Sequence, residues 1–83
     1  MLEIGRYEKQ LLGRLVIYSL FVKEKDGERT YGICISCGEE RESCILNGDL
    51  FLCVDLLRRI VNGDVFPYSL YELVEDFWAE QKI

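Results

Sequence analysis

The sequence predicts an α+β fold, in which an antiparallel three-stranded β-meander is followed by a C-terminal helical hairpin packed on one face of the sheet. Three observations support this fold class. Residues 14–46 contain segments rich in β-branched and aromatic residues, residues 50–78 carry apolar side chains at helical spacing, and turn residues separate these segments. The chain has 83 residues, which we expect to form one small domain over residues 1–83.

Residues 1–12 are the stretch whose pattern leaves the structure open. A short extra strand around residues 2–7 and a loose arm both fit this part of the sequence. A helical stripe of apolar residues is a third alternative, which Gly5 and Gly13 weaken because glycine disfavours helix formation.

A long strand is predicted over residues 14–25. Apolar side chains occupy both of its faces, which favours a central strand or a strand that is covered on both sides. Asp26 and Gly27 follow it and indicate a two-residue hairpin, because a type I′ turn needs positive φ at both central positions.

The chain is predicted to return in a second strand over residues 28–37. The face of this strand that contains Tyr31 carries the larger side chains, and the other face carries smaller ones. Gly32 lies inside the strand and indicates either a bulge or a close approach by another element. A polar turn at residues 38–40 then leads to a third, shorter strand over residues 41–46.

The first helix is predicted over residues 50–61. Asp49 precedes it as a candidate N-cap, and Asn62 and Gly63 provide its stop signal. The helix carries a broad apolar stripe made of Leu50, Cys53, Val54, Leu57, Ile60 and Val61, which Phe51 and Leu56 widen further.

The last helix has the clearest periodicity in the chain, with an apolar stripe made of Leu70, Leu73, Val74, Phe77 and Trp78. Two start signals compete. Pro67 suits the first helical position, whereas Ser69 and Glu72 form the pattern of a capping box. We expect the helix to begin within residues 67–69, and both helical stripes to pack on each other and on the Tyr31 face of the sheet.

The net charge is −5 and is unevenly distributed along the chain. Residues 1–30 carry six basic and five acidic groups, whereas residues 31–83 carry four basic and ten acidic groups. The acidic C-terminal half argues against nucleic acid as a partner, because a phosphate backbone binds basic surfaces.

No segment of the sequence is expected to enter a membrane. The longest apolar run, residues 15–22, is too short to span a bilayer and contains Ser19. The N-terminus lacks the ordered regions of a secretory signal peptide. We therefore expect a cytoplasmic protein whose four cysteines are reduced thiols.

The pattern V-x-P-x-x-L-x-x-x-V-E-D-F at residues 65–77 resembles the C-terminal signature of a small family of uncharacterised clostridial (Firmicutes) proteins that share a domain of unknown function. The tripeptide Tyr-Gly-Ile at residues 31–33 resembles the other recurring motif of that family. The family pattern has a capping threonine before the proline, where this chain has Phe66, and this difference favours Ser69 as the cap. The resemblance implies a cytoplasmic bacterial protein and implies no particular chemistry.

The segment Cys34-Ile-Ser-Cys37-Gly38 is the one motif with chemical character, since C-x-x-C-G is typical of a zinc knuckle. The chain has no histidine, so a zinc site would need Cys44 and Cys53 as its remaining ligands, at spacings that match no standard ribbon. A redox-active pair would need a helix N-terminus, whereas this motif ends a strand. We therefore expect no metal and no other cofactor, with the cysteines acting as small buried hydrophobic residues.

No catalytic constellation is recognisable among the acidic residues of the last helix. Glu72 and Asp76 lie one turn apart, but no histidine, nucleophile motif or phosphate-binding loop accompanies them. We therefore expect that the protein is not an enzyme.

Three aromatic residues of the last helix are the candidate contact residues. Tyr68 and Tyr71 lie off the apolar stripe, and Trp78 lies at its edge, beside the acidic face. The apolar fraction of 49% is also large for so small a domain. We therefore expect an interaction or regulatory module that binds a protein partner or a second copy of the chain as a homodimer. A zinc-stabilised domain is the alternative.

Overall fold

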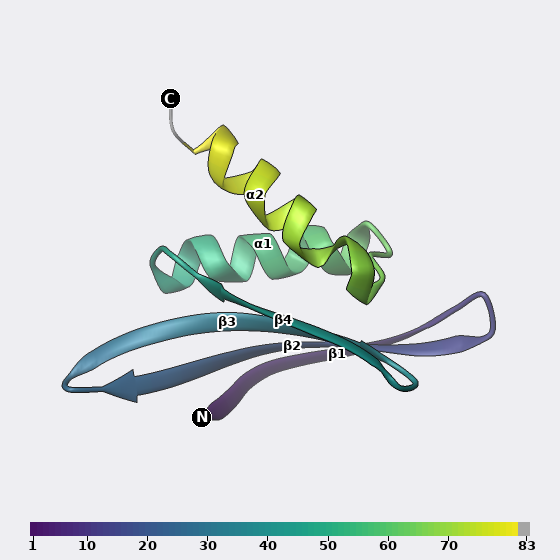
Figure 1. Ribbon diagram of the computed structural model, residues 1–83, viewed down its shortest axis with the longest axis horizontal. Helices are drawn as coiled ribbons and strands as arrows, with labels where there is room; N and C mark the ends of the chain where they lie inside the picture. Colours follow the sequence, from purple (N-terminus) through teal and green to yellow (C-terminus); the bar gives the residue numbers. More distant parts are fainter. Residues whose placement is uncertain (82–83) are drawn as a thin grey trace.

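The computed structural model describes residues 1–81 and has two layers, a four-stranded antiparallel sheet and two helices that cover one of its faces (Figure 1). The strands lie in the order of the sequence and are β1 (Leu2–Leu11), β2 (Arg14–Lys25), β3 (Glu28–Cys37) and β4 (Glu40–Leu46). The helical layer contains α1 (Leu50–Asn62), a 3₁₀ turn η1 (Pro67–Ser69) and α2 (Leu70–Glu80). The α+β class and the helical hairpin on one face are confirmed.

The expectation of three strands is wrong, because residues 2–11 form a full edge strand and neither a loose arm nor a helix. β1 pairs with β2 along its length, with an irregularity between Glu3 and Gly5. Gly5 lies under α1, so that a Cβ there would be 3.7 Å from Leu57 Cδ2. Lys9 Nζ also donates a hydrogen bond of 2.8 Å to the carbonyl of Val61 at the end of α1. β1 is therefore fixed by its neighbours more than by an apolar pattern of its own.

β2 is a central strand, as its sequence predicts, but in residues 1–81 helices cover only one of its faces. Val16, Tyr18 and Leu20 are buried under the helical layer. The hairpin to β3 has the expected turn, with φ values of 54° at Asp26 and 80° at Gly27. The prediction of a type I′ turn is confirmed.

Gly32 allows a close approach, which is one of the two alternatives that the sequence predicts. It pairs with Phe21 across β2 and β3, and a Cβ at Gly32 would lie 2.3 Å from the Phe21 ring. The ring therefore covers the glycine on the sheet face opposite the helices, where it remains half-buried.

The helices begin and end near the predicted positions. Asp49 caps α1 by accepting a hydrogen bond of 2.9 Å from the backbone N–H of Leu52. The last helical segment begins with Pro67 in a 3₁₀ turn, and α2 follows from Leu70. The predicted capping box is wrong, because the Ser69 side chain makes no capping hydrogen bond within the described part of the chain.

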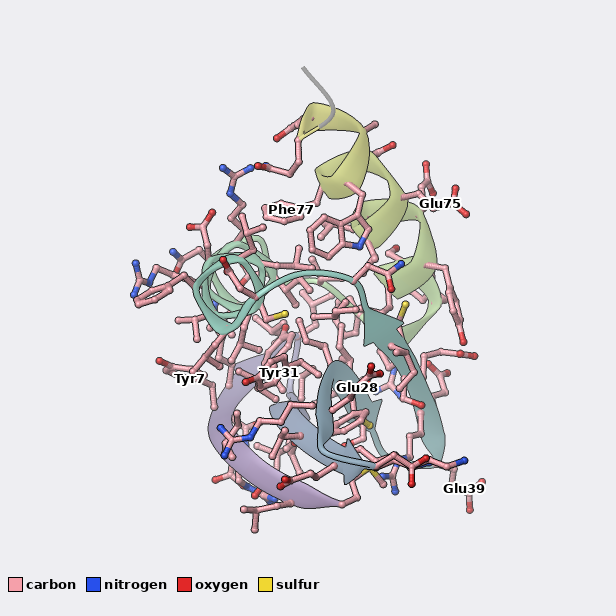
Figure 2. The ribbon with its side chains drawn as sticks, turned by 90° about the vertical axis from the view of Figure 1, so that its left-hand side faces the viewer. Tyr7, Glu28, Tyr31, Glu39, Glu75 and Phe77 are labelled. Carbon is pink, nitrogen blue, oxygen red and sulfur yellow. The ribbon has the colours of Figure 1, made fainter. Side chains whose placement is uncertain are left out.

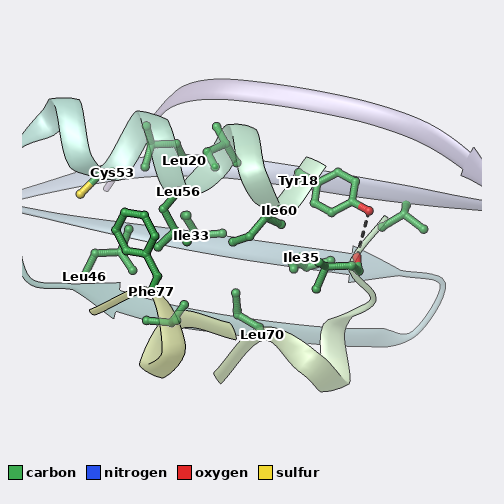
Figure 3. Packing of buried hydrophobic residues seen from close by; sticks show 14 of the residues in the cluster. Tyr18, Leu20, Ile33, Ile35, Leu46, Cys53, Leu56, Ile60, Leu70 and Phe77 are labelled. Carbon is green, nitrogen blue, oxygen red and sulfur yellow. Dashed lines mark hydrogen bonds between the residues drawn. The ribbon is translucent and has the colours of Figure 1, made fainter. Parts of the chain in front are cut away.

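The core lies between the helices and the face of the sheet that contains Tyr31 (Figure 3). Its fully buried residues come from β2, β3, α1, η1 and α2 and include Tyr18, Ile33, Ile35, Leu56, Ile60 and Leu70. The Tyr18 hydroxyl donates a hydrogen bond of 2.9 Å to the carbonyl of Val65, between α1 and η1. Both predicted stripes pack on this face through most of their residues, but Leu50, Phe51 and Val54, which the sequence assigns to the stripe of α1, remain exposed.

Candidate interaction surfaces

The four cysteines do not form a cluster in this structure. Because Cys34 and Cys37 are three residues apart in β3, their side chains point to opposite faces of the sheet. Cys37 and Cys53 belong to the core cluster, and Cys44 packs against it from β4. Among residues 1–81, no three histidine, cysteine or acidic side chains are arranged to hold a metal ion. Zinc binding by all four thiols would therefore require β3 to rearrange.

Burial also gives two of these thiols little nucleophilic character. Burial, and to a lesser degree Asp49, raises the pKa of Cys53 to about 11. Burial, followed by the nearby charge of Glu75, raises the pKa of Cys44 as well. A raised thiol pKa disfavours the thiolate, which is the reactive and metal-binding form.

The aromatic residues predicted as contacts lie on the side of the molecule where α2 meets β4. Tyr68 is 79% exposed and its ring stacks with Phe66 at a centroid distance of 6.3 Å. Tyr71 is 53% exposed and donates a hydrogen bond of 2.8 Å to the carbonyl of Ser43 in β4. Two of the three residues are thus largely accessible.

Trp78 has a mainly structural environment. It is half-buried, packs against the core cluster and meets Phe77 edge to face at a centroid distance of 5.1 Å. Its ring also lies against Gly48, where a Cβ would come within 2.8 Å. The structure places Tyr71 and Trp78 two turns apart along α2, with Glu75 between them at helical spacing. Tyr68 of η1 and Tyr71 and Trp78 of α2 therefore form a row, which we call the α2–β4 surface.

A second and more apolar surface lies on the opposite side of α1, above the start of β1. We call it the α1–β1 patch and define it by its large, exposed hydrophobic residues Leu2, Ile4, Tyr7, Leu50, Phe51 and Val54. Phe51 is 86% exposed and Leu2 is 64% exposed. A groove of about 470 Å³ runs through the patch and is lined mainly by residues of β1, β2 and α1, with Tyr31 of β3.

The packing of α2 explains why the α1–β1 patch is exposed. α2 lies against one side of α1, where Arg59 binds Glu80 with an N–O distance of 3.0 Å and covers the Phe77 ring. Helical spacing puts Leu50, Phe51 and Val54 on the other side of α1. Figure 2 looks along α1 and shows it above β1 and Tyr7, with α2 to its upper right, on the side away from Tyr7.

The sequence predicts Leu50 and Val54 as part of a buried stripe and does not identify the α1–β1 patch. The available signal is the width of that stripe, since Phe51 and Leu56 extend it beyond what one face of a helix can bury. Leu56 is fully buried, whereas Phe51 is almost fully exposed.

The acidic residues of α2 lie on its outer surface, where Glu72, Glu75, Asp76 and Glu80 are all exposed. Over residues 1–81, no helix is long and apolar enough to cross a bilayer. Comparison of the chain with protein-family models, with curated proteins and with solved structures gives no significant match. The resemblance to the clostridial family therefore stays a prediction.

Proposed function

We propose that this protein is a small, non-enzymatic interaction module that binds another protein surface through the α1–β1 patch. The exposed hydrophobic residues of this patch are the observation that carries the proposal, because contiguous apolar surface on a small domain is typical of a binding site. A cytoplasmic setting and the resemblance to the clostridial family belong to the same proposal. The four free cysteines support a reducing compartment.

The composition of the patch supports protein binding over binding of a small polar ligand. Phe51 and Tyr7 supply exposed aromatic contact area, and Leu2 supplies an exposed aliphatic side chain that lines the groove. The charged residues that line the groove, Glu24 and Arg29, are cross-strand partners at its rim. An apolar centre with a polar rim is the usual composition of a protein interface.

The α2–β4 surface is retained as a secondary contact region. Tyr68 is the most exposed aromatic residue on it, and the exposed acidic residues Glu72 and Glu75 follow it in the sequence of α2. We regard it as less favourable than the α1–β1 patch, because Trp78 is already engaged in packing and the Tyr71 hydroxyl already has a hydrogen-bond partner.

Site-specific photocrosslinking in cells of the source organism tests this function. A photoreactive phenylalanine analogue replaces Phe51, and in separate samples Tyr68 or Glu39. We expect a discrete protein adduct from position 51 and none from position 39, which lies in the exposed β3–β4 turn. An adduct from position 68 alone would move the contact to the α2–β4 surface. No adduct from position 51 or position 68 would refute the interaction function.

A further inference from the structure

We propose that the partner of the α1–β1 patch is a second copy of the chain, and that the two β1 strands pair antiparallel about a two-fold axis at Tyr7. The pairing would join both sheets into one eight-stranded sheet, with the helices of both copies on the same face. It rests on the proposed function and deepens it by naming the partner.

The free edge of β1 is the first observation. β1 is ten residues long and, in the described chain, pairs with another strand on one side only. An edge of this length presents unpaired N–H and C=O groups that favour the addition of another strand. The opposite edge of the sheet is less available, because β4 is shorter and Tyr71 occupies the carbonyl of Ser43.

The second observation is the charge pattern of β1, which is complementary to itself in one register. Paired residues of neighbouring strands point to the same face, so a two-fold pair must be centred on a residue. Centring on Tyr7 places Arg6 opposite Glu8 of the second copy, twice. Centring on Arg6 or on Glu8 would instead place two like charges opposite each other.

The side chains of Arg6 and Glu8 are already suited to this exchange. Arg6 Nη2 lies 3.2 Å from Glu8 Oε1 within one strand, and both side chains are about half exposed. They lie on the sheet face opposite the helices, since Gly5 and Tyr7 are on the helical face. The same charges could therefore form equivalent pairs between two copies without burying an unpaired group.

The third observation is the hairpin tip at Leu12. This leucine is 92% exposed and has a φ of 53°. Turn positions with positive φ normally hold glycine, asparagine or aspartate, so a leucine here is costly for the isolated chain. Leu12 is five residues from Tyr7, and the irregularity between Glu3 and Gly5 shifts its opposite position in the second copy by one residue, to residues 1–2. The Tyr7-centred register therefore brings Leu12 of one copy to the start of β1 in the other, where the groove of the patch lies.

The exposed area is also appropriate for a dimer of standard size. Taking about 150 Å² for a fully exposed large side chain, the six residues of the patch expose roughly 500 Å² of apolar surface. A standard interface buries about 800 Å² on each partner, of which about 60% is apolar. The patch thus supplies about the apolar area that such an interface requires.

Charge reversal tests the proposed register. Arg6→Glu and Glu8→Arg each place two like-charge pairs across the axis, and we expect either change to weaken the dimer about tenfold or more. An equimolar mixture of the two variants restores both opposite-charge pairs and is expected to form a heterodimer, as the double variant Arg6→Glu/Glu8→Arg forms a homodimer. Lys23→Glu, on an exposed residue of the interior strand β2, is the matched control and should leave the dimer unchanged.

Native mass spectrometry over a dilution series is the readout, with circular dichroism to verify the fold of each variant. Leu12→Asn should keep the turn and weaken association. Association of both single variants as tight as that of the wild type, or a monomeric wild type, would overturn the self-pairing. If the wild type is monomeric while position 51 crosslinks to a different protein, the interaction function stands and only the self-pairing fails. No crosslink at either tested surface would remove the function itself.

Discussion

Replacing Tyr18 with phenylalanine tests how the sheet holds the connection between the two helices. The Tyr18 hydroxyl donates to the carbonyl of Val65 at 2.9 Å, and Tyr18 is fully buried while Val65 is 7% exposed. The substitution keeps the ring and its packing, so the main loss is the partner of a buried carbonyl. Such a loss costs about 1–3 kcal/mol, and we expect about 1.5 kcal/mol in the free energy of unfolding.

For a domain of this size, about 1 kcal/mol shifts the melting temperature by roughly 4–8 °C, so Tyr18→Phe should melt roughly 6–12 °C below the wild type. Urea unfolding at a fixed protein concentration, followed by the fluorescence of Trp78, gives the free energy directly. Tyr68→Phe is the matched control, because it removes the same hydroxyl from a residue that is 79% exposed, and it should change stability by less than about 0.5 kcal/mol. Equal effects of the two substitutions, or no effect of Tyr18→Phe, would refute the assigned role of this hydrogen bond.

Three further predictions concern the stability effects of Cys53, Gly32 and the helix cap Asp49. The Cys53 thiol has a pKa of about 11 in the folded state, whereas the unfolded thiol ionises near its ordinary value of 9.0, so the free energy of unfolding should fall by about 2 kcal/mol between pH 9 and 11. Cys53→Ala should flatten that decline in a pH series of urea unfolding curves, and an unchanged slope would contradict the assignment. Gly32→Ala should displace the Phe21 ring and cost about 1–3 kcal/mol, seen as a lower urea midpoint, and a midpoint equal to that of the wild type would show that the ring adapts freely. Asp49→Ala should cost about 1 kcal/mol in thermal unfolding because the N–H of Leu52 loses its acceptor, and Asp49→Asn should retain most of the stability.

Much of the sheet could be predicted because β2 and β3 carry their own signals. Their β-branched residues and the Asp26-Gly27 turn determine a hairpin locally, before any tertiary contact forms. β1 lacks such a local signal, because most of its side chains are exposed and give no alternating apolar pattern. Its strand conformation depends on pairing with β2. The Ser69 cap failed for a related reason: Pro67 starts a 3₁₀ turn earlier and leaves Ser69 in a helical conformation.

The candidate surfaces were predicted only in part. Exposure of Tyr68 and Tyr71 follows from their positions off the apolar stripe of the last helix. The exposure of the α1–β1 patch depends instead on which side of α1 packs against α2. That packing is a tertiary contact, which the periodicity of the sequence does not predict. Periodicity assigns Val54 to the buried stripe, yet it remains 37% exposed because α2 packs on the other side.

A native mass spectrum of the wild-type protein, purified without chelator at micromolar concentration, tests the central claim most directly. Self-pairing through β1 predicts a metal-free species at twice the 9.7 kDa mass of the chain. A species of 9.7 kDa that persists at the highest concentration reached would contradict the dimer, and a mass increased by bound zinc would favour the cysteine site instead.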